Sequence, residues 1–267
     1  MLRITHYIGI FLFGLLSISC GNQNESEATA ENSQSVDTTE MAKYIITPFA
    51  PSPSFEDATI NSMNYSEGTF DFSIGGESYQ LGVQTPDAPQ KMCANSAEGQ
   101  HIHLIVDNEP YAAKYTSNFS YEIGDGSHYI LAFLSRSYHE SIKTDNAHVA
   151  VKADIKKNAI MHRENITGPM IFYSRPKGTY VGDDTKKVML DFYLINATLG
   201  NDYNVKADIN GEEHIIDNWQ PYYIEGLPMG ENTITLSLVD KDGQLVEAPL
   251  NPVSRTFTLV QDPAENQ

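Results

Sequence analysis

HIHLIVDNEPY at residues 101–111 is the most informative segment of the chain, because its pattern occurs a second time further along. NVKADINGEEH at residues 204–214 aligns with it without a gap. Both copies place alternating apolar residues before a turn dipeptide, DN at 107–108 and NG at 210–211. This alternation is typical of a half-buried strand, and such dipeptides are typical of tight hairpin turns. The sequence therefore predicts the same strand and turn twice.

Further segments on either side of these two stretches also match, and they occur in the same order in both copies. GSHYILAFL (126–134) aligns with GENTITLSL (230–238), and FDFSI (70–74) aligns with LDFYL (190–194). Short β-rich segments between turns rich in Gly, Pro, Asn and Asp are typical of β-sandwiches. The pattern resembles the immunoglobulin-like fold, so we expect an all-β protein with two tandem immunoglobulin-like β-sandwich domains.

The expected domain organisation follows from where this pattern begins and ends. It comprises a signal peptide at 1–19, a lipidated Cys20 with a flexible acidic tether over 20–43, a first sandwich over 44–157, a second over 158–262 and a tail at 263–267. The boundary between the sandwiches is expected near residues 156–168, and residues 155–165 are expected to be at most a short helical linker. Residues 79–84 are expected to form a strand.

The N-terminus has the features of an export signal. Residues 8–18 (IGIFLFGLLSI) are apolar but too few to span a bilayer as a helix. LSISCG at 16–21 resembles a bacterial lipoprotein lipobox, although Ser17 stands where the usual pattern has Leu. The resemblance implies lipidation of Cys20 and anchoring in the bacterial cell envelope, with the outer membrane as the expected location. The alternative is an ordinary secretory signal.

Charge and cysteine content exclude some classes of protein. The 17 basic and 35 acidic residues give a net charge of −18, which argues against nucleic acid as a partner. Residues 21–42 contain no aromatic and no basic residue, so they cannot form a core and are expected to be flexible. If Cys20 is lipidated, Cys93 is the remaining thiol, and the sandwiches must be stable without an intramolecular disulfide.

The second copy serves as an internal control for the first. His101 and His103 match Asn204 and Lys206, so they should lie on the outer face of their sheet. On the neighbouring strand, Tyr129, Leu131 and Phe133 match Thr233, Thr235 and Ser237. The outer face is thus aromatic and apolar in the first copy and polar in the second. Such a face is either used for recognition or covered, by residues 44–85 or by the second sandwich.

A polar loop is expected next to this face. SRSYHESIK at 135–143 places two basic side chains and a histidine among three serines, which suits the binding of an anion, although an ordinary polar loop has the same composition. Together with GQHIHLIVDNEPY, this loop resembles a group of exported bacterial proteins labelled phosphopeptide-binding. The expected site for an anionic, peptide or protein ligand comprises His101, His103, Tyr129, Phe133, Arg136, His139 and Lys143.

A metal site is the main alternative. His-x-His on a strand places two imidazoles on one face about 7 Å apart, a spacing that suits chelation. His139 would complete a metal set of His101, His103 and His139, and a mixed donor set would suit zinc or copper. The other candidate ligands are Met92, Cys93, Asp107 and His148.

The expected function is that of a non-catalytic binding or assembly protein of the cell envelope, attached to the membrane by its lipid. Nothing in the chain resembles a nucleophile elbow or a catalytic triad. A faint similarity to the cupin metal site fails because Glu109 lies too far from the histidine pair. We therefore expect no enzyme activity and no cofactor. The alternatives are a zinc- or copper-binding protein and a structural spacer.

Overall fold

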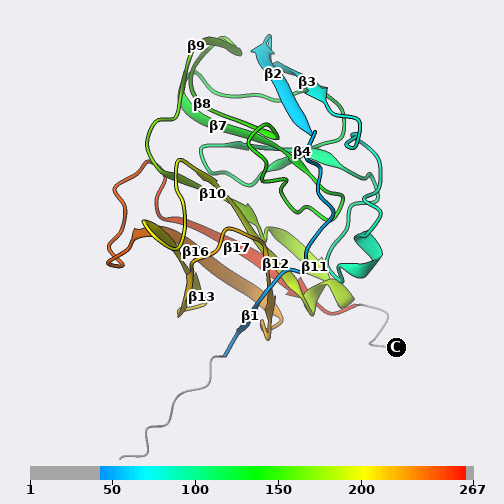
Figure 1. The fold of residues 1–267 in the computed structure, drawn as a ribbon, viewed down its shortest axis with the longest axis vertical. Helices are drawn as coiled ribbons and strands as arrows, with labels where there is room; N and C mark the ends of the chain where they lie inside the picture. Colours follow the sequence, from blue (N-terminus) through cyan, green and yellow to red (C-terminus); the bar gives the residue numbers. More distant parts are fainter. Residues whose placement is uncertain (1–42, 263–267) are drawn as a thin grey trace, which may run out of the picture. The chain divides into compact units, whose positions relative to one another are not determined.

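The computed structural model describes residues 43–262, which belong to one compact unit of β-strands with two short 3₁₀ helices (Figure 1). These helices are η1 (Ala88–Gln90) and η2 (Gly182–Thr185). The predicted all-β fold is confirmed. Within residues 43–262 there is no helix long and apolar enough to cross a membrane. The predicted signal peptide, Cys20, the tether up to residue 42 and the tail at 263–267 lie outside the described residues.

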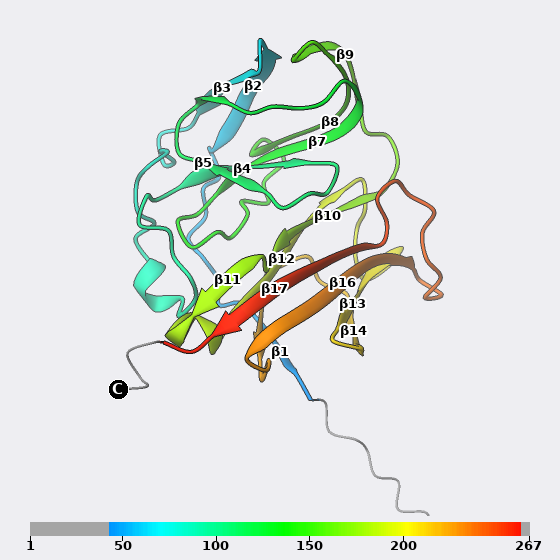
Figure 2. The same ribbon diagram turned by 180° about the vertical axis from the view of Figure 1, so that it is seen from behind.

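The first sandwich consists of a three-stranded and a five-stranded sheet (Figure 2). In sheet order, the strands are β2 (Thr59–Ser66), β3 (Thr69–Gly75) and β6 (Asn118–Ser120), facing β5 (Ala112–Lys114), β4 (His101–Val106), β7 (Gly126–Ser135), β8 (His148–Lys156) and β9 (Ala159–Asn165). Alternation determines which side chains enter the core. On β3, for example, Phe70 and Phe72 are buried while Asp71 between them is exposed.

The second sandwich is built in the same way from a four-stranded and a five-stranded sheet. In sheet order, the strands are β1 (Ile45–Pro48), β15 (Tyr222–Glu225), β12 (Val188–Ile195) and β10 (Met170–Arg175), facing β11 (Gly178–Val181), β17 (Val253–Val260), β16 (Gly230–Asp240), β13 (Tyr203–Ile209) and β14 (Glu212–Ile216). Its core contains Leu190 and Phe192 from one sheet, packed with Leu236 and Phe257 from the other.

The two sandwiches share one topology. The orders β2-β3-β6 with β5-β4-β7-β8 and β10-β12-β15 with β14-β13-β16-β17 both correspond to strands A-B-E facing C′-C-F-G of an immunoglobulin-like sandwich. The registers also agree, because His103 lies opposite Phe133 and the matching Lys206 lies opposite Ser237. The predicted immunoglobulin-like β-sandwich fold is therefore confirmed, and the two sandwiches agree in residue register.

Three segments differ from the predicted organisation. β1 lies within the range assigned to the first sandwich, yet it pairs with β15 of the second. The expected helical linker is instead β9, which forms a hairpin with β8 through residues 157–158, both at positive φ. Residues 79–84 form no strand; Tyr79 is buried and its hydroxyl donates to backbone carbonyls of His101 and Ser135. The ranges 44–157 and 158–262 stay a prediction, since all described residues belong to one unit.

The outer faces of the two sandwiches pack on each other. Every residue of β4, β10 and β12 is buried, because these strands are covered on both sides. Phe133 of β7 stacks on Tyr193 of β12 with ring centroids 4.9 Å apart, and Leu131 and Phe172 belong to the same apolar cluster. The apolar outer face of the first sandwich is therefore covered by the second, which was one of the alternatives left open by the sequence.

Candidate functional site

Three histidines bring their ring nitrogens together beside this contact. His101 and His103 are alternate residues of β4, and His139 belongs to the loop after β7. His101 Nε2 lies 2.8 Å from His103 Nε2 and 3.0 Å from His139 Nδ1. One potential ligand atom from each ring lies within 4.8 Å of the other two. We call His101, His103 and His139 the histidine cluster.

His139 reaches the cluster because the loop after β7 turns back tightly. The backbone N–H of His139 donates to the carbonyl of Arg136, and that of Arg136 donates to the carbonyl of Glu140. His139 has a φ of 71°, a left-handed conformation in which histidine is enriched among residues other than glycine. This turn places the imidazole of His139 against the ring of His101, with centroids 4.8 Å apart.

Hydrogen bonds outside the cluster orient two of the rings. The Nδ1–H of His101 donates to the carbonyl of Gly99 at 2.8 Å, which leaves its Nε2 as an acceptor facing the other rings. Gly99 has φ +87°, and a Cβ there would lie 2.6 Å from Gly82 C, so only glycine fits. His103 Nδ1 lies 3.3 Å from Ser174 Oγ of β10. Metal-binding histidines are oriented by outer hydrogen bonds of this kind.

Aromatic rings enclose the cluster. The ring of Tyr111 stacks on that of His103 with centroids 3.6 Å apart, and its hydroxyl lies 3.3 Å from His139 Nδ1. Phe133 also packs against His103, with ring centroids 4.9 Å apart, and Tyr115 packs against His101 at the same distance. Within these contacts His101 and His103 are fully buried, whereas His139 is partly exposed.

Burial keeps the three imidazoles neutral. It lowers the pKa of His101 to about 4, and it lowers those of His103 and His139 well below their usual 6.5. The positive charges of Arg175 and Lys177 lower all three values further. A neutral imidazole has the lone pair that a metal ion requires, so no proton needs to be displaced from these ligand atoms by a metal at neutral pH.

The donor set fits a borderline transition-metal ion. With metal–nitrogen bonds of about 2.0–2.1 Å, the nitrogens of a tetrahedral site lie about 3.4 Å apart. In the histidine cluster two separations are 2.8 and 3.0 Å and all three nitrogens lie within 4.8 Å, so the rings must shift to bind one ion at these bond lengths. Imidazole nitrogen suits zinc, copper and nickel rather than magnesium or calcium. Three protein ligands leave one position for an exogenous ligand, as in open zinc sites.

The remaining predicted ligand residues are not gathered on an open face. Phe133 is fully buried against His103 and Tyr193, and Tyr129 is half-buried at the edge of the same apolar cluster. These two side chains contribute to the contact between the sandwiches. Phe133 packs against the histidine cluster, whereas Tyr129 lines a separate cavity with Lys152 and Met170.

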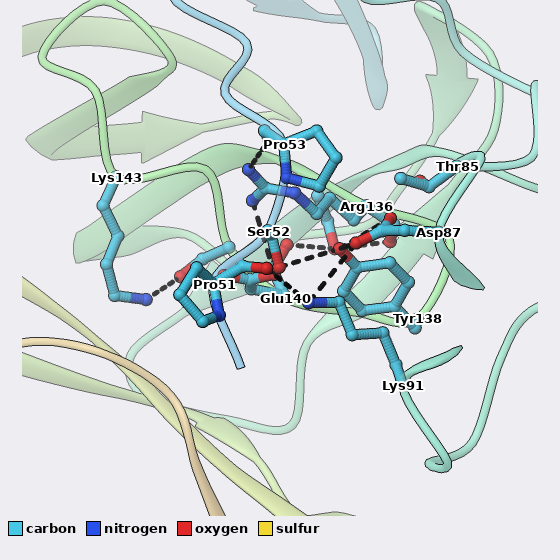
Figure 3. A network of polar contacts seen from close by, with 12 residues as sticks. Pro51, Ser52, Pro53, Thr85, Asp87, Lys91, Arg136, Tyr138, Glu140 and Lys143 are labelled. Atoms are coloured by element: carbon cyan, nitrogen blue, oxygen red, sulfur yellow. Dashed lines mark hydrogen bonds and ion pairs between the residues drawn. The ribbon is translucent and has the colours of Figure 1, made fainter. Parts of the chain in front are cut away.

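The two cations of the predicted anion-binding loop have partners within the chain (Figure 3). Arg136 donates to the carbonyl of Pro53 and forms an ion pair with Glu140, with Nη1 to Oε2 at 3.6 Å. Lys143 forms an ion pair of 2.6 Å with the fully buried Asp191 of β12. Of the three residues expected to grip an anion in this loop, only His139 joins His101 and His103.

The other proposed ligands lie elsewhere. Asp107 binds His128, with Oδ2 2.5 Å from Nδ1. The His148 ring packs on Tyr193 at 5.0 Å. Met92 and Cys93 line a separate cavity of about 760 Å³ between the loop around η1 and the loop around η2.

Sequence reasoning missed the residues that the second sandwich contributes. Ser174 faces His103 from β10, and the next residue, Arg175, is buried close by. No sequence signal marks either residue, because both meet the cluster only through the packing of the sandwiches. Tyr111 and Gly99 flank the histidine strand in sequence, and a search of its immediate neighbours would have included both.

Comparisons with known proteins give no further identification. No family model matches the chain, and no curated protein matches it. Among solved structures, fibronectin(III)-like modules of Clostridium thermocellum CbhA match at 17% identity and TM-score 0.28, covering 35% of this chain and 99% of theirs. The central fibronectin-III array of RIM-binding protein matches at 9% and 0.26, covering 81% and 72%. Because these scores are low, the fold assignment rests on the strand order alone.

Proposed function

We propose that this protein is a non-catalytic, lipid-anchored protein of the bacterial cell envelope that binds a zinc or copper ion between its two sandwiches. The observation that supports the metal most strongly is the convergence of three neutral imidazoles within 4.8 Å, of which His101 and His103 are fully buried and His139 is partly exposed. The anchor rests on the lipobox resemblance around Cys20. A role in holding or sensing a metal suits the site better than turnover, because His101 and His103 are fully buried under the second sandwich.

The metal also has a structural consequence. The cluster joins β4 to the loop after β7, and Ser174 connects it to β10 of the second sandwich. A ligand that binds only the folded state stabilises it, by about 2.7 kcal/mol at a concentration one hundred times Kd. Metal binding would therefore stabilise the contact between the sandwiches as well as the loop.

The test is metal binding by the purified protein and by His139→Asn. Asparagine tolerates the positive φ of this position, so the variant removes a ligand with little backbone strain. We expect one zinc or copper ion per chain in the native protein, a raised melting temperature, and an affinity at least about tenfold lower in His139→Asn. His162→Asn is the matched control, because His162 is exposed on β9 and outside the cluster.

Two results would contradict the proposal. One is a native protein that binds neither zinc nor copper above the level of an unrelated control protein. The other is a metal affinity that falls equally in His139→Asn and His162→Asn. Either result would favour the alternatives without a metal, namely a protein that binds another ligand or a structural spacer.

A further inference from the structure

Arg175 is a buried cation without an anion. Arg175 is only 5% exposed. Its Nε and Nη2 both donate to the hydroxyl of Tyr180, at 3.2 and 2.8 Å. Its Nη1 is buried and has no hydrogen-bond partner within residues 43–262. None of the ion pairs among these residues includes Arg175. A buried charge of this kind is costly unless something compensates it.

This cation lies next to the histidine cluster. Ser174, the residue before it, contacts His103 Nδ1 at 3.3 Å. A second cation lies against Tyr111. Lys177 Nζ is 4.1 Å from the centroid of the Tyr111 ring, and the same ring stacks on that of His103. The register of β10 on β12 places Arg175 opposite Asp191, whose carboxylate binds Ser141 and Lys143 of the loop that carries His139.

A metal ion in the histidine cluster would add positive charge to a region that already contains the cations Arg175 and Lys177. Three neutral imidazoles leave a divalent ion with its full charge, and Arg175 and Lys177 add two more positive charges nearby. None of the ion pairs within residues 43–262 joins the carboxylate of Asp184 to Arg175. Like charges in a buried site repel strongly because water does not screen them.

We propose that the metal ion binds together with a small anion, of carboxylate or other oxyanion type, which occupies its open coordination position and is held by the charge of Arg175. The inference rests on the proposed metal site. It assigns the exogenous ligand of that site to a chemical class, and it gives the unpartnered guanidinium nitrogen a role. Lys177 adds a second, more distant positive charge.

The experiment loads the purified protein with Co²⁺, whose visible spectrum reports its ligands, in a buffer without coordinating anions. Azide, acetate and phosphate are then added separately, so that carboxylate and phosphate can be distinguished. In the native protein we expect a saturable spectral change and a Co²⁺ affinity about tenfold higher at a saturating concentration of the anion, within the range usual for coupled sites.

The decisive variant is Arg175→Gln. We expect it to bind the anion at least about tenfold more weakly while binding Co²⁺ in anion-free buffer at least as tightly as the native protein, because a repelling charge has been removed. Arg175→Lys should restore part of the anion affinity. A purely structural role of Arg175 would instead weaken Co²⁺ binding itself. Arg163→Gln is the control, since Arg163 donates to the Met63 carbonyl on β2.

Lys177→Gln keeps the proposal testable if Arg175→Gln does not fold, because Lys177 is only partly buried. We expect it to weaken anion binding about threefold, less than Arg175→Gln does. A Co²⁺ affinity that does not change with any of the three anions, or an anion effect that is equal in native protein and Arg175→Gln, would overturn the inference. Failure to bind Co²⁺, zinc or copper at all would instead overturn the proposed function.

Discussion

Two equivalent sheet faces of this protein lie in opposite environments. One is the outer face of β4 and β7 in the first sandwich, and the other is the outer face of β13 and β16 in the second. The corresponding strands have the same order and register. His103 opposite Phe133 is fully buried, whereas Lys206 opposite Ser237 lies on a polar face and pairs with Glu213 at 2.7 Å. The backbone therefore does not decide what this face does. The side chains on it decide whether this face is polar or packs against the other sandwich and carries His101 and His103.

The turns after β4 and after β13 show the same contrast at a single residue. Asn108 and Gly211 occupy equivalent positions, and both have positive φ. The side-chain amide of Asn108 donates to the carbonyl of Ile171 and accepts from the N–H of Tyr173, so it forms two hydrogen bonds with the backbone of β10. Gly211 has no side chain to do this. Specific polar contacts thus fix the apolar contact between the sandwiches in one arrangement.

Exchanging the central pair of this comparison should have the largest effect. His103→Lys installs the residue of the second sandwich at a fully buried position whose recorded contacts are neutral side chains, so we expect the free energy of unfolding to fall by about 3–5 kcal/mol. The reverse exchange, Lys206→His, loses a surface ion pair and should change it by less than about 1 kcal/mol. Chemical denaturation of both variants measures the difference, and equal effects would show that the two faces are not distinct.

The next effect is a pH dependence that arises from the buried histidines of the first sandwich. Burial lowers the pKa of His101 to about 4 in the folded state, against about 6.5 when unfolded, so the unfolded chain binds more protons between these values. The metal-free protein should therefore lose stability as the pH falls from 6.5 through 4, by roughly 3 kcal/mol for this residue. Denaturation of native protein and His101→Asn at several pH values isolates this contribution; parallel curves would contradict it.

The smallest effect concerns the turn. Asn108→Gly keeps a residue suited to positive φ and removes both hydrogen bonds to β10, so we expect a loss of about 2 kcal/mol. Gly211→Asn is the matched exchange in the second sandwich, where a Cβ would meet no atom within 4 Å, and it should cost less than about 1 kcal/mol. Thermal unfolding compares the two, and a loss in Gly211→Asn as large as in Asn108→Gly would remove the assigned role of Asn108.

The repeat explains how much of this could be read from the sequence. Aligning residues 101–111 with 204–214 predicts the strand register and places His101 and His103 on the outer face, because alternation fixes the direction of each side chain. His139 could be proposed as a third ligand from its place after the neighbouring strand. These inferences depend only on local pattern and on pairing within one sandwich.

The rest depends on contacts that leave no local pattern. An apolar outer face indicates that something covers it or binds it, but not which element does so. The second sandwich covers the histidine strand through β10 and β12, and it thereby contributes Ser174 and Arg175. Arg136 and Lys143 suited an anion by composition alone, but Glu140 and Asp191 pair with them once the chain is folded. Similarly, the four residues of β1 carry no signal that they pair with β15.

The most direct measurement of the central claim is anomalous X-ray diffraction from crystals of the protein grown with zinc, recorded above and below the zinc absorption edge. The account predicts one strong peak about 2.0–2.1 Å from His101 Nε2, His103 Nε2 and His139 Nδ1. Crystals with the three rings in hydrogen-bonding contact and zinc only at surface carboxylates would contradict it.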